Sequence, residues 1–149
     1  MKKAKARTGA KAAKRGNAPH GNLNAVFDEL KGMMAVHVPP FKAGGGQVPA
    51  KKDFHLIVPV PVVVSPNAYG GKPYPVAMAS LILQKGFVGF YYTPVYLVPG
   101  LKNKLRPKLA KLLKGKSCFH VTALEAEVRE GIKEALEIGV QCFRERGWL

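Results

Sequence analysis

The stretch VAMASLILQKGFVGFYYT, residues 76–93, decides the fold. Two runs rich in apolar residues, 76–84 and 87–93, flank the pair Lys85-Gly86. Because Gly86 can adopt the positive φ that a tight reverse turn requires, the stretch predicts a β-hairpin. Apolar and aromatic side chains occupy both odd and even positions of the second run. We therefore expect side chains on both faces of that strand to be buried.

Three segments precede the hairpin. Apolar residues at spacings of four, three and four predict a short helix over 24–34, and two consecutive prolines prevent its continuation. Residues 41–53 contain three consecutive glycines and predict an exposed loop. Residues 54–64 have the composition of a strand, but their two prolines cannot donate to a ladder. This last segment is predicted as an edge strand or an extended strap.

The segment after the hairpin predicts a helix, a strand and a second helix. Pro107 suits the first turn of a helix that carries a stripe of leucines, and 117–121 is predicted as a short strand. Thr122 and Glu125 form a capping box, which predicts the start of the longest helix, extending to about Arg146. The order of elements predicts an α+β fold, with a small antiparallel sheet and helices packed on one face.

Composition divides the chain into a tail and a body. Residues 1–21 consist mainly of Lys, Arg, Ala and Gly, and they predict a disordered basic tail. With 47% apolar residues in 149, the rest of the chain, 22–149, predicts a single domain. The longest apolar run, 56–64, is too short to span a bilayer, and no apolar segment of a secretory signal follows the charged start. We expect a soluble cytoplasmic protein without membrane contact.

Positive charge is the outstanding feature of the composition. The chain has 24 Lys and Arg against nine Asp and Glu, a formal net charge of +15. No acid occurs from Phe54 to Leu124, while seven bases fall within Leu101 to Lys116. Such a cluster binds phosphate backbones by releasing counterions, although a solubilising surface is an equally good explanation. The candidate polyanion-binding residues are Lys102, Lys104, Arg106, Lys108, Lys111, Lys114 and Lys116.

Several short motifs resemble a known family. They are Lys85-Gly86-Phe87-Val88-Gly89-Phe90-Tyr91, then Pro94, Tyr96, Pro99 and Pro107, then Gly115-Lys116-Ser117-Cys118-Phe119, and finally Phe143 to Trp148. Over roughly residues 76–149 the chain resembles the YdhG-like family, a domain of unknown function. The resemblance implies an α+β fold. Some members are described as frataxin-like iron chaperones, so the resemblance also implies metal handling as a hypothesis.

Two groups of side chains are candidate metal ligands. Cys118 and His120 are two apart in a predicted strand, so they share a face and offer a thiolate and an imidazole to one ion. An acidic stripe on the last helix, Glu127, Glu130 and Glu134, offers hard oxygen ligands. A buried thiol and a solvated helical face are the alternatives for these two groups. No cofactor is predicted.

The sequence favours binding over catalysis. Packing of the hairpin against the last helix predicts an apolar pocket lined by Tyr91, Tyr92 and Phe119. Without the fold, no set of nucleophile, base and orienting group can be assembled from the four His and two Cys, so an enzyme has the least support and is left as an open alternative. The predicted function is a non-enzymatic module that contacts nucleic acid or another polyanion without sequence preference. Metal handling and small-ligand binding are the alternatives, and the oligomeric state is left open.

Overall fold

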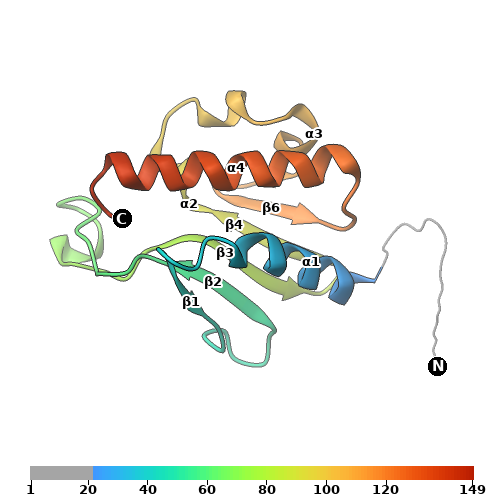
Figure 1. Cartoon of the computed structure of the whole chain (residues 1–149), viewed down its shortest axis with the longest axis horizontal. Helices are drawn as coiled ribbons and strands as arrows, with labels where there is room; N and C mark the ends of the chain where they lie inside the picture. Colours follow the sequence, from blue (N-terminus) through green and yellow to red (C-terminus); the bar gives the residue numbers. More distant parts are fainter. Residues whose placement is uncertain (1–21) are drawn as a thin grey trace.

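The computed structural model describes residues 22–149 (Figure 1). The prediction of a disordered tail falls on residues 1–21 and lies outside the described residues. In chain order the elements are α1 (Leu23–Ala35), β1 (Lys42–Gly44), β2 (Asp53–Ile57), η1 (Tyr69–Gly71), β3 (Ala77–Gln84), β4 (Phe87–Tyr92), α2 (Thr93–Leu97), η2 (Leu101–Lys104), α3 (Pro107–Ala110), β5 (Leu113–Lys114), β6 (Cys118–Val121) and α4 (Ala126–Glu145).

Six antiparallel strands form one sheet in the order β1-β2-β3-β4-β6-β5. The predicted hairpin is its centre: β3 and β4 pair with Gln84 opposite Phe87, and Gly86 has a φ of 90°. Both long helices, α1 and α4, pack on the same face of the sheet (Figure 1). The predicted α+β fold, with an antiparallel sheet and helices on one face, is therefore confirmed.

Three local predictions are wrong. Part of the expected loop over 41–53 forms strand β1, so β2 pairs on both sides and the edge-strand alternative for 54–64 is wrong, whereas 58–64 lies outside the named strands, as the strap alternative predicted. The helix after Pro107 has only four residues because Leu113 and Lys114 pair with β6 instead. The longest helix has Glu125 at its N-cap position, and the side chain of Glu125 accepts no hydrogen bond from a helix amide. The predicted capping box, with Thr122 as the N-cap residue, is therefore not formed at the start of this helix.

The hydrophobic core lies between the sheet and the two long helices. In β4, Phe90 and Tyr92 are fully buried, and the Tyr92 hydroxyl donates to the carbonyl oxygen of Ala135 in α4. Gly139 lets α4 approach the sheet closely, because a Cβ there would lie 2.5 Å from the sulfur of Met78. Strand residues alternate between the two faces of a sheet, so the neighbours of these core residues point the other way.

None of the helices between residues 22 and 149 combines the length and the apolar character that crossing a bilayer demands.

Candidate functional site

The face of the sheet opposite α1 and α4 carries a row of residues, one from each strand, most of them with polar or aromatic side chains. The strand register places six residues side by side, in the order Gly44, His55, Ser80, Tyr91, Cys118 and Lys114. Their neighbours along the strands, such as Leu56, Leu81 and Phe90, are buried on the helix side. Among residues 22–149 no long helix covers the second face, which we call the open face.

A chain of hydrogen bonds joins three polar residues of the open face. The Nε2 of His55 is 2.9 Å from Oδ2 of Asp53, and its Nδ1 is 2.7 Å from Oγ of Ser80. Strand alternation puts Asp53 and His55 on one face, and Ser80 lies directly across from His55 on β3. We call these three residues the polar triad. It is largely removed from solvent, since the side chains of Asp53 and His55 are 2% and 9% exposed.

Backbone amides hold the carboxylate of Asp53. The N–H groups of Gly46, Gln47 and Val48 donate to it over 2.7, 2.8 and 3.0 Å, all from the loop between β1 and β2. Burial raises the pKa of Asp53, but the hydrogen bonds from His55 and from these amides outweigh that effect and lower the pKa to about 2. The carboxylate is therefore ionised at neutral pH.

An ionised Asp53 fixes the protons of the triad. A carboxylate can only accept, so Nε2 of His55 carries the proton that lies between the two residues. In the neutral imidazole, Nδ1 is then an acceptor, and the hydroxyl of Ser80 donates to it. With a neutral imidazole, Ser80 therefore donates to His55 and His55 donates to Asp53.

A pocket opens directly above the polar triad. It has a volume of about 550 Å³, within the range of small-molecule sites. His55 and Ser80 form part of its floor, α2 forms one wall with Thr93 and Tyr96, and the strap that joins β2 to β3 forms another. The strap contributes Tyr69 and Tyr74, whose rings stack with centroids 3.9 Å apart, as well as Val64 and Ala68.

Aromatic side chains continue along the open face beyond the pocket. The rings of Phe87 and His120 stack with centroids 3.8 Å apart. The ring of Tyr91 lies over Gly89, where a Cβ would be only 2.8 Å from it. Burial raises the pKa of the Cys118 thiol, which keeps it protonated and makes it a poor ligand or nucleophile.

The candidate metal ligands do not form a metal centre in the described part of the chain. Residues 22–149 contain no group of three or more His, Cys, Asp or Glu placed to share an ion. Cys118 and His120 do share the open face, but His120 stacks on Phe87. On α4, Glu127 and Glu134 both bind the guanidinium of Arg106, over 3.1 and 2.8 Å.

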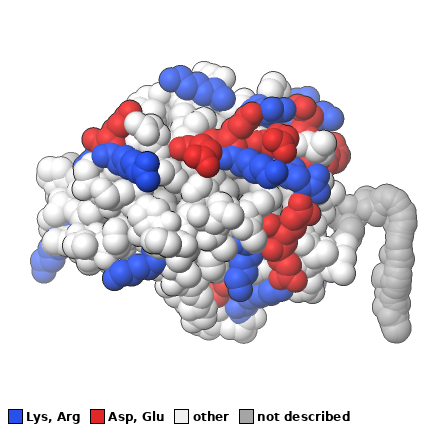
Figure 2. Space-filling model, viewed as in Figure 1, with Lys and Arg blue, Asp and Glu red and all other residues white. Residues whose placement is uncertain are grey.

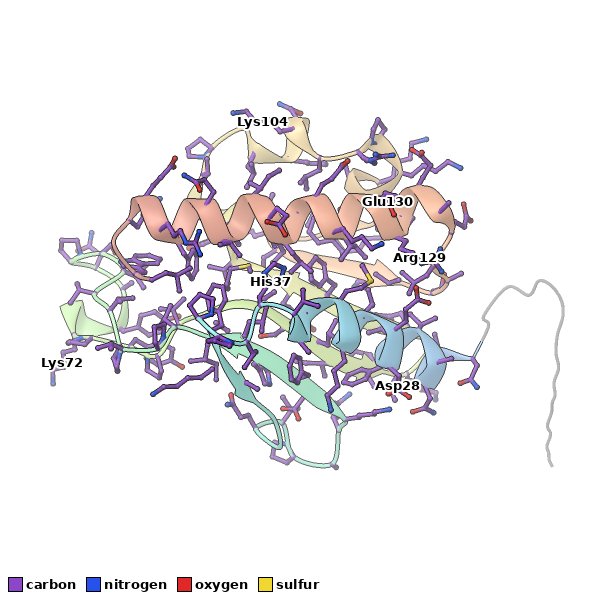
Figure 3. All side chains as sticks on the ribbon, viewed as in Figure 1. Asp28, His37, Lys72, Lys104, Arg129 and Glu130 are labelled. Atoms are coloured by element: carbon purple, nitrogen blue, oxygen red, sulfur yellow. The ribbon has the colours of Figure 1, made fainter. Side chains whose placement is uncertain are left out.

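The third glutamate of the stripe, Glu130, pairs with Lys133 over 3.4 Å. Figure 3 shows Glu130 and the neighbouring Arg129 on α4, close to the N-terminal end of that helix. The acidic stripe is thus compensated by bases, as expected for a solvated helical face.

The seven candidate polyanion-binding residues differ in their surroundings. Arg106 is held by two glutamates, and Lys108 lies 3.6 Å from Glu125. Within residues 22–149, the other five make no ion pair with a carboxylate. Lys114 ends the row on the open face, and Lys116 lies over the ring of Tyr96 at 5.7 Å. Lys104, by contrast, lies beyond α4 on the side away from α1 (Figure 3).

Carboxylates are confined almost entirely to the helix layer. Of the nine in the chain, two lie in α1 and six in α4 or at its N-cap. Figure 2 shows these side chains gathered over the two helices, interspersed with Lys and Arg. The ninth is Asp53, whose charge is buried under backbone amides. The open face therefore presents Lys side chains with no exposed carboxylate among the described residues.

The pocket predicted from the sequence is corrected by the structure. Tyr92 and Phe119 are fully buried on the helix side, while Tyr91 lies on the open face, so the three do not line one cavity. The pocket of the open face is lined instead by His55 and Ser80, and Asp53 holds His55 by a hydrogen bond; the sequence did not predict these three residues as a site. One signal pointed to them: Asp53 is the only acid between Glu29 and Glu125, and it lies two residues before His55 in a strand.

Comparison with known proteins adds no family to this description. Neither family models nor curated proteins nor solved structures gave a match to the chain. The resemblance to the YdhG-like family stays a prediction.

Proposed function

We propose that the protein binds a small aromatic molecule, neutral or anionic, in the pocket of the open face. The observation that carries this proposal is a buried polar triad whose hydroxyl end, Ser80, opens into a cavity walled by three tyrosines. Pockets for small molecules combine largely apolar walls with a few fixed polar groups in this way. The chemistry of the walls selects the ligand class.

Aromatic walls and fixed hydroxyl groups favour a planar ligand with a polar substituent. Tyr69, Tyr74 and Tyr96 offer ring faces and phenolic hydroxyls, and Ile57, Val64 and Leu97 add apolar surface. Since Ser80 donates its proton to His55, its oxygen retains lone pairs that accept from a ligand hydroxyl or amine.

Charge favours an anion over a cation in this pocket. Asp53 is the only carboxylate of the open face among residues 22–149, and it is already compensated by three amides and His55. Lys116 lies over Tyr96 at the pocket wall, so a ligand carboxylate has a cation within reach of the site. An aromatic carboxylate combines these features.

The test is titration of ¹⁵N-labelled protein with 4-hydroxybenzoate and its neutral and cationic analogues, followed by amide chemical shifts. We expect saturable shifts at pocket residues such as Ala77, Ser80 and Thr93. Tyr96→Ala removes an aromatic ring from the pocket wall and should weaken binding. Because Tyr96 is 61% exposed, the substitution should not unfold the protein.

A second hollow provides the matched control. It lies between α1 and α4, has a volume of about 650 Å³ and is lined by Met33, Val36 and Leu136 among others. Val36→Ala shortens an exposed apolar side chain there and should leave pocket binding unchanged. Shifts confined to residues of this second hollow, or absent throughout, would contradict the proposal.

We infer a second function, polyanion binding, from the distribution of charge. The open face combines an absence of exposed carboxylates among the described residues with Lys114 at its edge and aromatic rings along its length. Single-stranded nucleic acids bind surfaces of this kind by phosphate contacts and base stacking. Fluorescence anisotropy with a labelled oligonucleotide across a salt series tests it. Affinity that does not fall with salt would exclude a phosphate-based contact.

A further inference from the structure

We propose that Ser80 is an activated nucleophile and that the pocket hydrolyses carboxylic esters of aromatic alcohols. This proposal rests on the proposed small-molecule site and adds a reaction to it. It is carried by the order of the hydrogen bonds in the polar triad and by the opening of the pocket at the serine.

The triad has the three parts that activate a serine. A base must lie within hydrogen-bond reach of the hydroxyl, and a third group must orient that base. Nδ1 of His55 lies 2.7 Å from Oγ of Ser80 and is the base of the triad when the imidazole is neutral, and Oδ2 of Asp53 lies 2.9 Å from Nε2 on the opposite side of the ring. Here the serine faces Nδ1 and the carboxylate faces Nε2. Either ring nitrogen can act as the base when the other carries the proton.

Asp53 acts as a positioning residue and stabilises the charge that develops. Its carboxylate is ionised and is held in place by three loop amides. Rotation of the His55 ring would break its hydrogen bond to this fixed carboxylate, so Asp53 keeps the ring in one orientation. When His55 accepts a proton it becomes an imidazolium next to this buried negative charge. An ion pair shielded from water stabilises that state more strongly than the same pair in solvent.

The pocket sets the substrate class and offers a donor for the oxyanion. The tyrosine rings on α2 and on the strap can stack on the ring of an aromatic alcohol. The described part of the open face has no exposed carboxylate that would repel the anionic acid product. Tyrosine hydroxyls serve as oxyanion donors in acyl transfer. Tyr96 lines the pocket with Ser80, and its hydroxyl has no hydrogen-bond partner among residues 22–149.

The reaction balances without a cofactor. Ser80 Oγ forms a bond to the carbonyl carbon of the ester, and its proton passes to Nδ1 of His55. The tetrahedral intermediate then loses the bond between the carbonyl carbon and the alcohol oxygen, and His55 returns the proton to that oxygen as the alcohol leaves. Water repeats both steps on the acyl-enzyme and releases the carboxylic acid and free Ser80.

The experiment uses a fluorophosphonate probe on the full chain, followed by intact mass and peptide mapping. Peptide mapping assigns the adduct to one residue, so labelling of Ser80 is distinguished from reaction of the probe with a lysine or a pocket tyrosine. We expect one adduct per chain on Ser80, abolished in Ser80→Ala and reduced at least about tenfold in rate in His55→Gln. Ser117→Ala is the matched control, because it removes another serine of the sheet region outside the pocket.

Turnover of 4-nitrophenyl acetate then links labelling to hydrolysis. Tyr96→Phe should lower kcat by a larger factor than it weakens the binding of 4-hydroxybenzoate, because the ring stays in the pocket wall and only the hydroxyl assigned to the oxyanion is lost. If 4-hydroxybenzoate binds the pocket but Ser80 stays unlabelled, the nucleophile proposal is overturned and the binding proposal stands. If 4-hydroxybenzoate does not bind the pocket and Ser80 is not labelled, the binding proposal and the nucleophile proposal are both overturned. Amide spectra of each variant show whether the fold is retained.

Discussion

At the scale of single residues, Asp53 has two structural tasks. It accepts hydrogen bonds from three consecutive amides and so shapes the loop between β1 and β2, and it also orients His55. Buried donors that lose their acceptor cost free energy, because water no longer satisfies them. One side chain therefore couples the stability of the loop to the geometry of the triad.

Asp53→Asn should destabilise the protein by about 2 kcal/mol at neutral pH, since an amide accepts these hydrogen bonds less strongly than a carboxylate does. The pKa of Asp53 is lowered to about 2 in the folded state. Its contribution to stability is therefore fully present above about pH 4, the pKa of an unfolded Asp, and is lost as the pH falls toward 2.

Urea unfolding of the wild type and Asp53→Asn between pH 7 and 2 measures this effect. The difference in free energy of unfolding should be constant above about pH 4 and shrink below it. Asp28→Asn is the control, because Asp28 is exposed and pairs with Lys52 at the surface, where an ion pair contributes about 0.5 kcal/mol. A difference that grows on acidification would contradict the assigned role.

At the scale of elements, strand register assembles the site and helix packing supports it. A shift of β3 by one residue would turn Ser80 to the helix side and expose Leu81, so burial of the core face fixes the triad across the sheet. On the core face, α4 approaches β3 at Gly139, which has no side chain to separate helix and sheet. The core thus determines which side chains reach the pocket.

Two helical glycines should respond to alanine in opposite directions. Gly139→Ala places a methyl group 2.5 Å from the sulfur of the buried Met78, and overpacking of about 1–3 kcal/mol should exceed the gain in helix propensity of about 1 kcal/mol. Gly32→Ala in α1 meets no atom within 4 Å, so it should stabilise by about 0.5–1 kcal/mol. Thermal unfolding of both variants measures this. A stabilised Gly139→Ala would show that Met78 moves aside freely.

At the scale of the whole molecule, charge is separated between the two layers. The helix layer holds eight of the nine carboxylates, paired in part with Arg106, Arg129 and Lys133. The open face has Lys side chains and the single buried carboxylate of Asp53 among the described residues. An anion in solution is therefore drawn toward the open face rather than toward the helices.

Charge-reversal variants on each of the two layers distinguish binding by a specific surface from binding by the overall net charge. Lys114→Glu with Lys116→Glu should weaken oligonucleotide binding and reduce the slope of log K against log salt by about 2, because each lysine neutralises about one phosphate. Lys31→Glu with Lys133→Glu changes net charge equally on the helix layer and should have a smaller effect. Anisotropy titrations compare them. Equal losses would assign binding to overall charge alone.

Local pattern was sufficient for the fold class. The turn at Lys85-Gly86 and the apolar stripes of the two long helices depend on backbone sterics and periodicity, which act between near neighbours in the chain. The same reasoning failed where pairing with distant residues overrode local preference. Strand β1 lies in a glycine-rich segment that was predicted as a loop. Leu113 and Lys114 follow the predicted helix pattern, but they pair with β6 as a short strand.

The sequence by itself determined an α+β chain with a basic composition and a central hairpin. Only the tertiary structure decided which charged and polar groups meet. Asp53 and His55 come from one strand and Ser80 from another, 25 residues later than His55, and their contact depends on the register that core burial selects. The physical reason is that periodicity assigns a side chain to a face, whereas proximity across strands is set by the packing of the whole sheet against its helices.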